Sequence, residues 1–295
     1  MEQKSIVGLG EILWDMLPEG PKLGGAPANF AYHVAQHGLR GCVASAVGTD
    51  LLGKEILDTL ADKNLHCVMA TVSFPTGTVE IEVDAGGIPR YDIKTGAAWD
   101  NIPYTNNLRT LALNTRAVCF GSLAQRSPVT RATIRKFLSD MPRTEDSLVV
   151  FDVNLRQDFF TREILDESMT ECNILKINDE ELGIVGPMFD IEGDFRRICR
   201  ALIDRYSLRT LILTCGATGS YVFTPDAEYF RATPVVEVAD TVGAGDSFTA
   251  AFIAALIKGK SVEEAHALAV DTSAYVCTCK GAMPEYPANF NSQCL

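Results

Sequence analysis

The sequence lacks any run of apolar residues long enough to cross a membrane. Its most apolar helical stretch, around 250–257, is far shorter than the roughly 20 residues that a membrane-spanning helix needs. The first residues also lack the apolar segment and the small-residue cleavage site of a signal peptide. We therefore expect a cytoplasmic protein.

Clusters of Lys and Arg are missing as well. With 26 Lys and Arg against 38 Asp and Glu, the net charge is −12, which argues against nucleic acid and anionic membranes as partners. Any phosphate that the protein binds must be held locally by backbone amides, a few cations or a metal ion. The nine cysteines are scattered and odd in number, and Cys277-x-Cys279 has no second pair nearby, so reduced thiols are expected rather than disulfides or a zinc site.

What the sequence does contain is a repeated alternation of short apolar runs and amphipathic stretches, with no linker rich in Pro, Gly or Ser. This alternation predicts an α/β fold, with a mostly parallel sheet between helices and residues 1–295 forming a single domain. The apolar runs expected as strands are Ser5–Leu9, Gly41–Val47, Ala117–Phe120, Leu148–Asp152, Ile174–Ile177 and Thr210–Leu213.

One segment departs from this alternation. Residues 76–93 alternate between polar and apolar types on either side of a glycine-containing turn at 85–89, which is the pattern of a β-hairpin. A hairpin has no place inside a parallel core, so we expect it to project from the sheet and to cover a site.

The strongest candidate for chemistry is the segment Asp240–Asp246, Asp-Thr-Val-Gly-Ala-Gly-Asp, which follows a strand-like run and opens an apolar helix. Its glycines permit a tight turn, and the free N–H groups at a helix start form an anion site. The carboxylate of Asp246 in the same turn suits phosphoryl transfer, in which amides hold phosphate charge while the carboxylate accepts a hydroxyl proton. An ordinary helix start, with Asp246 complementing the helix dipole, would explain the same residues equally well.

A second candidate is the segment Gly24–Asn29, Gly-Gly-Ala-Pro-Ala-Asn. Two glycines allow a tight turn, and Pro27 suits the first turn of a helix. The amide of Asn29 can donate and accept at once, as a sugar hydroxyl requires, although a plain helix start remains the simpler reading of this segment alone.

These two segments resemble the N-terminal and C-terminal signatures of the ribokinase-like (PfkB) carbohydrate kinases, in the right order and more than two hundred residues apart. The resemblance implies the ribokinase fold, with a small β-sheet lid formed by about 11–22 and 76–100. It also implies an ATP-dependent phosphotransferase. The resemblance assigns the catalytic base to Asp246 and the anion hole to Gly243, Ala244 and Gly245.

Further segments resemble the sugar-binding parts of the family. Asp15 follows the first strand, where the family has a sugar-binding aspartate, and a carboxylate can accept hydrogen bonds from two sugar hydroxyls. The segment Asp152-x-Asn154-x-Arg156 resembles bacterial fructokinases and 2-keto-3-deoxygluconate kinases, and residues 96–100 resemble the fructokinase branch. The sugar contacts that the resemblance implies are Asp15, Gly24, Gly25, Asn29, Ala97 and Arg156.

The nucleotide motifs come later in the chain. Residues 178–181 have the spacing of a capping box and resemble the Asn-x-x-Glu motif that lies near magnesium in the family. Residues 214–220 resemble its glycine-containing nucleotide loop. The resemblance implies nucleotide contacts at Lys176, Asn178, Thr214, Gly216 and Gly219, Mg²⁺ near Glu181 through water, and a monovalent cation such as K⁺ beside Asp240.

The function expected from the sequence is transfer of the γ-phosphoryl group of ATP to a primary hydroxyl of a small sugar, with fructose favoured. Kinases of 2-keto-3-deoxygluconate, ribose or a nucleoside are alternatives. An acidic sugar would need an extra cation, for which Arg90, Lys94 and Arg156 are candidates. A sugar-binding regulator without catalysis is the alternative of another class, and the intact glycine turn with Asp246 argues against it. A homodimer through the apolar face of the lid is also expected.

Two further patterns are weaker. Residues 48–55 nearly spell a phosphate-binding P-loop, but Glu55 stands where a hydroxyl should hold magnesium, so an ordinary helix start is expected. His33 and His37 are four residues apart without a visible third metal ligand, and we expect them on a polar helix face.

Overall fold

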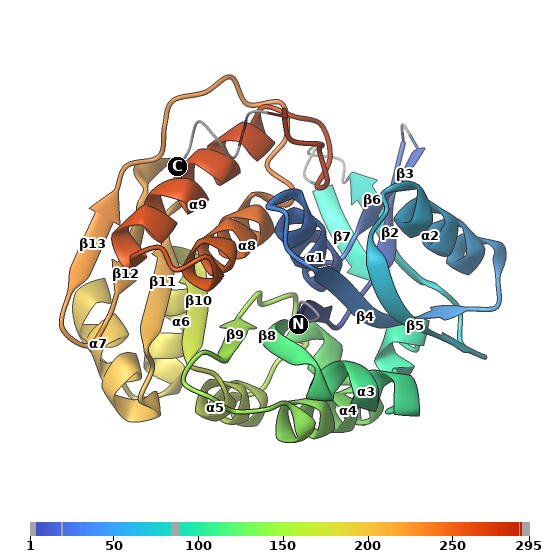
Figure 1. Ribbon diagram of the computed structural model, residues 1–295, viewed down its shortest axis with the longest axis horizontal. Helices are drawn as coiled ribbons and strands as arrows, with labels where there is room; N and C mark the ends of the chain where they lie inside the picture. The colour runs from blue at the N-terminus through green and yellow to red at the C-terminus, as the bar shows by residue number, and fades with distance from the viewer. Residues whose placement is uncertain (1–3, 19, 84–88, 289, 291–295) are drawn as a thin grey trace.

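The computed structural model describes residues 4–18, 20–83, 89–288 and 290, and the strands within them form two sheets of unequal size (Figure 1). In spatial order the large sheet contains β13 (Glu228–Arg231), β12 (Ser220–Phe223), β11 (Thr210–Thr214), β10 (Ile174–Asn178), β9 (Leu148–Asp152), β8 (Thr115–Gly121), β1 (Ser5–Leu9), β4 (Gly41–Gly48) and β5 (His66–Val72). The small sheet contains β3 (Gly20–Gly24), β2 (Leu13–Leu17), β6 (Gly77–Val83) and β7 (Pro89–Ile93).

The prediction of an α/β fold with a mostly parallel sheet is confirmed. From β11 to β5 every neighbouring pair in the large sheet is parallel, and only β12 and β13 at one edge run antiparallel to their neighbours. All six apolar runs expected as strands lie in this parallel part. Strands buried on both faces read as continuous apolar runs, which is why the sequence pattern identified them.

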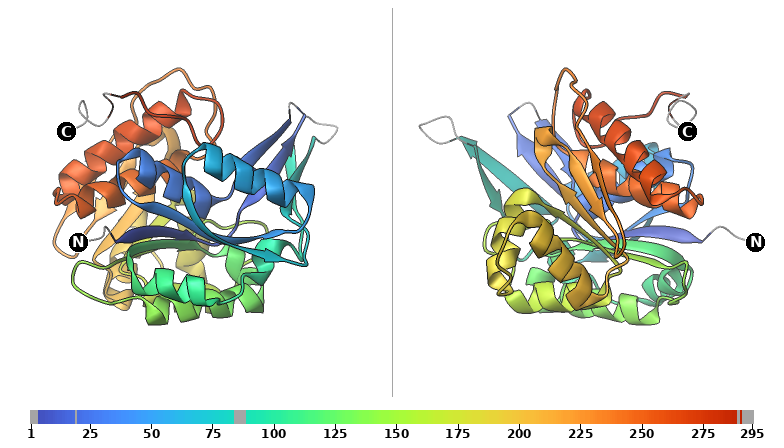
Figure 2. Two further views of the ribbon diagram at one scale, coloured as in Figure 1. Left: turned by 45° about the vertical axis from the view of Figure 1, so that its right-hand side comes forward. Right: turned by 90° about the vertical axis from the view of Figure 1, so that its left-hand side faces the viewer.

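Helices cover both faces of the large sheet (Figure 2). Alternate residues of β1 serve two cores: Val7 packs with the helices on one face, whereas Ile6 packs with those on the other. The first face carries α3 (Asn106–Leu113), α4 (Pro128–Asp140), α5 (Arg162–Glu171), α6 (Asp179–Met188) and α7 (Phe195–Tyr206). The second carries α1 (Ala26–Gln36), α2 (Leu51–Asp62), α8 (Ala244–Ile257) and α9 (Val262–Cys277).

The small sheet projects from this body, as the right-hand view of Figure 2 shows. The hairpin expected at 76–93 is present as the antiparallel pair β6 and β7, with Val79 opposite Ile93. Residues 85–88 of its expected turn lie outside the described residues. The second segment of the small sheet, β2 and β3, joins it through parallel pairing of β2 with β6.

The connections place the small sheet at one edge of the large one. Because β1 ends at Leu9 and β2 begins at Leu13, the small sheet starts at the carboxyl end of β1. The carboxyl ends of the parallel strands β8, β9, β10 and β11 lie along the same edge. This is the edge at which open α/β sheets bind ligands. Among the residues that the structure describes, no helix is both long and apolar enough to span a lipid bilayer.

The structure also shows what the two weaker sequence patterns form. Asp50 is the N-cap of α2 and accepts the N–H of Gly53, so the near P-loop is an ordinary helix start, as expected. The expectation for the histidines was wrong, because His33 and His37 are both buried. The two ring nitrogens of His33 bond to Ala282 O (2.8 Å) and to the hydroxyl of Tyr286 (2.7 Å), which leaves neither free for a metal.

Candidate active site

The two strongest sequence motifs meet at the starts of two helices that lie side by side, α1 and α8 (Figure 1). The side chain of Asn29 in the first turn of α1 donates a hydrogen bond from Nδ2 to Oδ2 of Asp246 in the first turn of α8, over 2.8 Å. The two residues are 217 positions apart in the sequence. The fold thus places the amide expected to hold a sugar hydroxyl next to the carboxylate expected to accept its proton.

Glycine is required at both helix starts. Gly243 precedes α8 with φ of 79°, and a Cβ there would lie 2.8 Å from the carbonyl oxygen of Ala282. Gly25 precedes α1 with φ of 111°, and a Cβ there would lie 2.5 Å from the carbonyl oxygen of Glu11. Both turns therefore combine a positive φ with a close backbone neighbour, which only glycine accommodates without strain.

The carboxyl group of Asp246 is tuned towards neutral pH. Burial raises its pKa to about 6, and the nearby charge of Asp152 acts in the same direction. The hydrogen bond from Asn29 and the positive charges of Lys176 and Arg156 oppose this rise. A carboxylate with such a pKa is still ionised at pH 7 but is more basic than an exposed one, as a general base needs to be.

A buried cation faces the start of α8. Lys176 Nζ pairs with Oδ1 of Asp152 at 3.1 Å, and their side chains are 9% and 7% exposed. A Cβ on Gly245 would come within 3.3 Å of the same Nζ atom, so the ammonium group lies against the glycine turn. Burial lowers the pKa of Lys176, but the charges of Asp152, Glu181 and Asp246 outweigh it and raise the pKa overall. The ammonium group therefore stays charged and adds a fixed positive charge to an amide-lined helix start.

Glu181 forms hydrogen bonds at the end of β10 and in the loop after β9. The expected capping box is present, because Asn178 Oδ1 accepts the N–H of Glu181 while Glu181 Oε2 accepts the N–H of Asn178. Its other oxygen, Oε1, accepts the N–H of Leu155 at 2.9 Å. Burial raises the pKa of Glu181, and Lys176 opposes that rise.

The carboxylate of Glu181 fits a magnesium ion that is held mainly by phosphate and water. No group of three or more His, Cys, Asp or Glu side chains that could enclose a metal ion occurs within the described residues. Mg²⁺ usually keeps several waters and takes only one or two carboxylates in phosphate-transfer sites. Each oxygen of Glu181 keeps a second lone pair for a water molecule, so its hydrogen bonds do not exclude that arrangement.

Of the expected sugar contacts, Asp15 and Gly24 lie against each other. A Cβ on Gly24 would lie 2.6 Å from Asp15 Oδ2, which places this carboxylate directly over the Gly24 backbone. Burial raises the pKa of Asp15 to about 6, and the positive charges of Arg156 and Lys22 oppose the rise. The charge of Arg156 acts on both Asp15 and Asp246, while its exposed side chain donates to the carbonyl oxygen of Leu155 at 3.0 Å. Ala97 is buried, and its N–H donates to Asp100 Oδ2 over 3.1 Å.

The nucleotide motifs occupy adjacent strand ends. Asn178 at the end of β10 pairs with Thr214 at the end of β11. The loop after β11 contains Gly216 and Gly219, whose φ angles are 51° and 145°. The carboxylate of Asp240 accepts two backbone N–H groups, from Val242 at 3.1 Å and from Gly281 at 3.0 Å, and so links the turn before α8 to the segment after α9.

Sequence reasoning missed Glu11, which follows β1. Its side chain is buried, and Oε2 has no hydrogen-bond partner among the described residues. Burial raises its pKa to about 7; its own backbone and Arg156 oppose the rise, and the charges of Asp246 and Asp152 add to it. A buried acceptor without a protein partner calls for an explanation, and here it lies within the electrostatic reach of the candidate base. The sequence signal was a Glu placed directly after Gly10 at a strand end.

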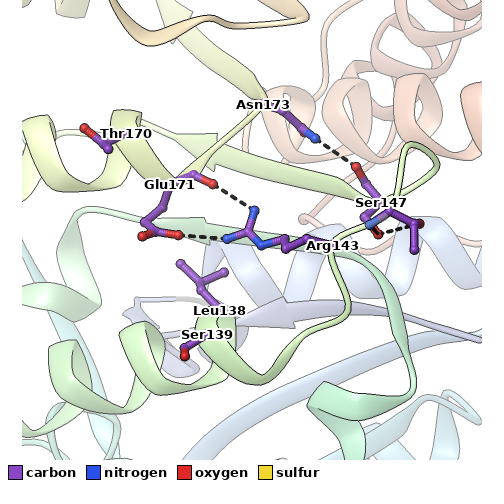
Figure 3. A pocket seen from close by; sticks show the side chains of 8 residues that line it. Leu138, Ser139, Arg143, Ser147, Thr170, Glu171 and Asn173 are labelled. Atoms are coloured by element: carbon purple, nitrogen blue, oxygen red, sulfur yellow. Dashed lines mark hydrogen bonds and ion pairs between the residues drawn. The ribbon is translucent and has the colours of Figure 1, made fainter.

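Two hollows differ in their relation to these residues. A narrow cavity beside Asp246 is also lined by Asp152 and Asn154. The larger one, of about 580 Å³, lies near Ser147 and Asn173, which directly precede β9 and β10 at the opposite edge of the sheet (Figure 3). Several of its polar groups are bonded to one another, Arg143 to Glu171 and Asn173 to the Ser147 carbonyl. Because none of the motif residues lines it, the larger hollow is not the candidate active site.

Comparisons with known proteins identify the family of the chain. The family model described as pfkB family carbohydrate kinase matches residues 21–289. A fructokinase of Klebsiella pneumoniae is 29% identical over 299 residues, which cover 95% of each chain. A nucleoside kinase of Methanothermobacter thermautotrophicus is 26% identical over 274 residues, which cover 90% of this chain and 81% of that protein. The fructokinase of Xylella fastidiosa, solved with bound ATP, shares the fold with a TM-score of 0.86 at 18% identity, over 99% of this chain and 98% of that one. The chain therefore belongs to the pfkB family of carbohydrate kinases.

Proposed function

We propose that this protein is a fructokinase, which transfers the γ-phosphoryl group of ATP to a primary hydroxyl of fructose. The coarser activity needs no proposal: the chain is a sugar kinase of the pfkB family, a phosphotransferase with an alcohol group as acceptor. The observation that carries the proposed site is the hydrogen bond between Asn29 and Asp246, with Lys176 beside the same helix start. Fructose as the acceptor is supported by the similarity to a fructokinase and by residues 96–100 and 152–156.

In the proposed mechanism the sugar is oriented before the proton moves. Asp246 accepts the proton of the attacking hydroxyl as the new bond to the γ-phosphorus forms, while the bond from that phosphorus to the β–γ bridging oxygen breaks and ADP leaves. The amides of residues 243–246 and the ammonium group of Lys176 hold the charge that develops on the transferred group. The residues proposed to hold the sugar are Asp15, Gly24, Gly25, Asn29, Ala97 and Arg156.

The nucleotide is proposed to lie across the ends of β10 and β11. Magnesium, when bound, would neutralise phosphate charge near Glu181, with water between the ion and the carboxylate. A monovalent cation such as K⁺ is proposed beside Asp240. The proposed nucleotide contacts are Lys176, Asn178, Thr214, Gly216 and Gly219.

The small sheet is proposed to act as a lid. It begins at the carboxyl end of β1, and the connections that join it to β1 and α1 contain Glu11 and Gly25, so its closure would exclude water from the sugar side of Asp246. Pairing of two lids in a homodimer and a cytoplasmic location are part of the same proposal.

A kinase acting on a nucleoside, ribose or 2-keto-3-deoxygluconate remains the second candidate, and the similarity to a nucleoside kinase favours keeping it. For an acidic sugar, one expected cation is already engaged. Lys94 pairs with Asp92 at 2.6 Å and with Glu80 at 2.9 Å. Arg156 would then have to neutralise the acid, and the side chain of Arg90 lies outside the description.

An acceptor screen tests the proposal. Fructose, ribose, 2-keto-3-deoxygluconate and adenosine are each supplied with ATP and Mg²⁺, and the phosphorylated product is measured. We expect the highest kcat/KM with fructose. A higher value for another acceptor would replace fructose, and an absence of product with every acceptor would favour the non-catalytic regulator.

A further inference from the structure

A buried arginine contacts the segment by which the chain leaves the small sheet after β7. This exit segment, residues 93–100, runs from the end of β7 through Ala97 into the 3₁₀ turn η1 (Ala98–Asn101). Arg126 ends a second short turn, η2 (Leu123–Arg126), directly after β8. Its Nε donates to Asp100 Oδ1 at 2.8 Å, and its Nη2 donates to Asp100 Oδ2 at 2.9 Å and to the Lys94 carbonyl at 2.6 Å.

The guanidinium group is fixed on its faces as well as at its edge. It lies between the rings of Trp99 and Phe159, with its central carbon 4.2 Å and 4.4 Å from the two ring centroids. The side chains of Arg126 and Asp100 are only 7% and 6% exposed. A planar, two-pronged cation stacked between rings has one favoured orientation, which a lysine ammonium cannot reproduce.

Two proposed sugar contacts each lie one hydrogen bond from this sandwich. Asp100 Oδ2, which accepts from Arg126, also accepts the N–H of Ala97 at 3.1 Å. On the other side, the N–H of Phe159 donates to the carbonyl oxygen of Arg156 at 3.1 Å. Arg126 therefore joins the Ala97 turn to the loop that carries Arg156.

The chain enters the small sheet for the second time at β6, and a different residue holds it there. Asp50 accepts the N–H of Thr76 at 2.8 Å and its hydroxyl at 2.6 Å, just before β6 begins. Loss of the Arg126 contacts would thus leave the sheet attached at its entry, and the effect should be confined to the exit segment and the Arg156 loop.

We propose that Arg126 is a positioning residue for the sugar, which holds Ala97 and the Arg156 loop at a fixed separation across the acceptor site. This inference rests on the proposed roles of Ala97 and Arg156, but it does not depend on the sugar being fructose. The contacts of Arg126 go to the exit segment and to Phe159, whereas the nucleotide motifs lie on β10 and β11. A change at Arg126 should therefore weaken sugar binding more than ATP binding, since the Arg156 loop reaches the nucleotide side indirectly, through the hydrogen bond from Leu155 to Glu181.

The test compares Arg126→Lys with the wild type in steady-state kinetics, varying sugar and ATP separately. We expect the KM for the sugar to rise by roughly fivefold or more, while the KM for ATP stays within about twofold, because only the sugar contacts are displaced. The matched control is Arg131→Lys on α4, where the arginine pairs with Glu163 and Glu167. That control should leave both constants unchanged.

An unchanged sugar KM in Arg126→Lys would overturn the proposal, and so would an equal rise in both constants. If Arg126→Lys does not fold, Phe159→Leu removes one ring and keeps the ion pair. It should still raise the sugar KM by about two- to fivefold, and no rise would overturn the proposal. If the wild type prefers another acceptor to fructose, the proposed function fails, and the comparison made with that acceptor still tests Arg126.

Discussion

The ammonium group of Lys176 lies 3.1 Å from a carboxylate oxygen of Asp152 and at the same time faces the glycine turn that begins α8. In a chain of net charge −12, this buried pair keeps an ammonium group beside the amides of that turn. The negative partner helps to keep the cation charged. Under the proposed function, the ammonium group and the amides would together hold a phosphate locally.

Replacement of Lys176 by Met should therefore lower both the turnover and the stability of the protein. Loss of a charged group from a preorganised phosphate site typically costs about 10²- to 10³-fold in kcat, and we expect a fall of that size. Because the change also leaves Asp152 buried and unpaired, stability should drop by roughly 3–5 kcal/mol. Urea denaturation and kcat measured on the same preparations check both effects. In the control Lys136→Met, the lysine pairs with Asp140 on an exposed helix face, and both quantities should hardly change.

Replacement of Asp246 by Asn should lower kcat by about 10²-fold or more, because the general base is lost while the shape of the side chain is kept. Sugar binding, measured by calorimetry, should be largely retained. Near-normal turnover of this variant would refute the assignment of Asp246 as the base.

The hydrogen bond between Asn29 and Asp246 predicts a shift in pH dependence. The base must be ionised, so kcat/KM should fall as the pH drops through the pKa of Asp246, at about 6. The Asn29 amide lowers this pKa, and Asn29→Ala should therefore raise it and move the acid limb of the profile to higher pH. A pH–rate profile of the two proteins checks the direction. A variant that is weaker at all pH values without a shift would argue against this electrostatic role.

The glycine turn before α8 can be tested against a glycine with the same backbone angle. Gly243 has φ of 79° and Gly259 has φ of 82°, but a Cβ would meet the backbone of Ala282 only at the first site and nothing within 4 Å at the second. Gly→Ala at either site should cost about 1–2 kcal/mol of stability from backbone strain. Only Gly243→Ala should also lose most of its activity, because the amides of the turn must shift. Thermal melts and kcat of the two variants separate strain from loss of function.

The features that the sequence predicted well are local ones, which depend on residues close together in the chain. Strands buried on both faces appear as apolar runs, and the turns before α1 and α8 carry their glycines within a few positions of Asn29 and Asp246. Roles that arise from contacts between distant segments could not be read in this way. His33 looked like a polar-face residue because its partners, Ala282 and Tyr286, come about 250 residues later.

The same limit applies to Arg126 and Glu11. Nothing in the residues next to Arg126 shows that Trp99 and Phe159 will enclose it, and nothing next to Glu11 shows that Asp246 lies within its electrostatic reach. Both residues follow strands at the carboxyl edge of the large sheet, and that position becomes informative only once the strand order is known.

Glu11 predicts how the stability of the protein depends on pH. Its pKa is about 7 in the folded protein and 4.5 when exposed, so folding favours the protonated form. Its contribution to stability is therefore fully present below pH 4.5 and is lost as the pH rises through about 7. Glu11→Gln keeps the shape of the side chain and cannot ionise, so its stability relative to the wild type should rise from pH 5 to pH 8, by up to about 3 kcal/mol. Urea denaturation at both pH values measures the difference. A difference that stays constant with pH would show that Glu11 is paired or hydrated in the folded protein, and that its carboxylate is not held neutral by burial.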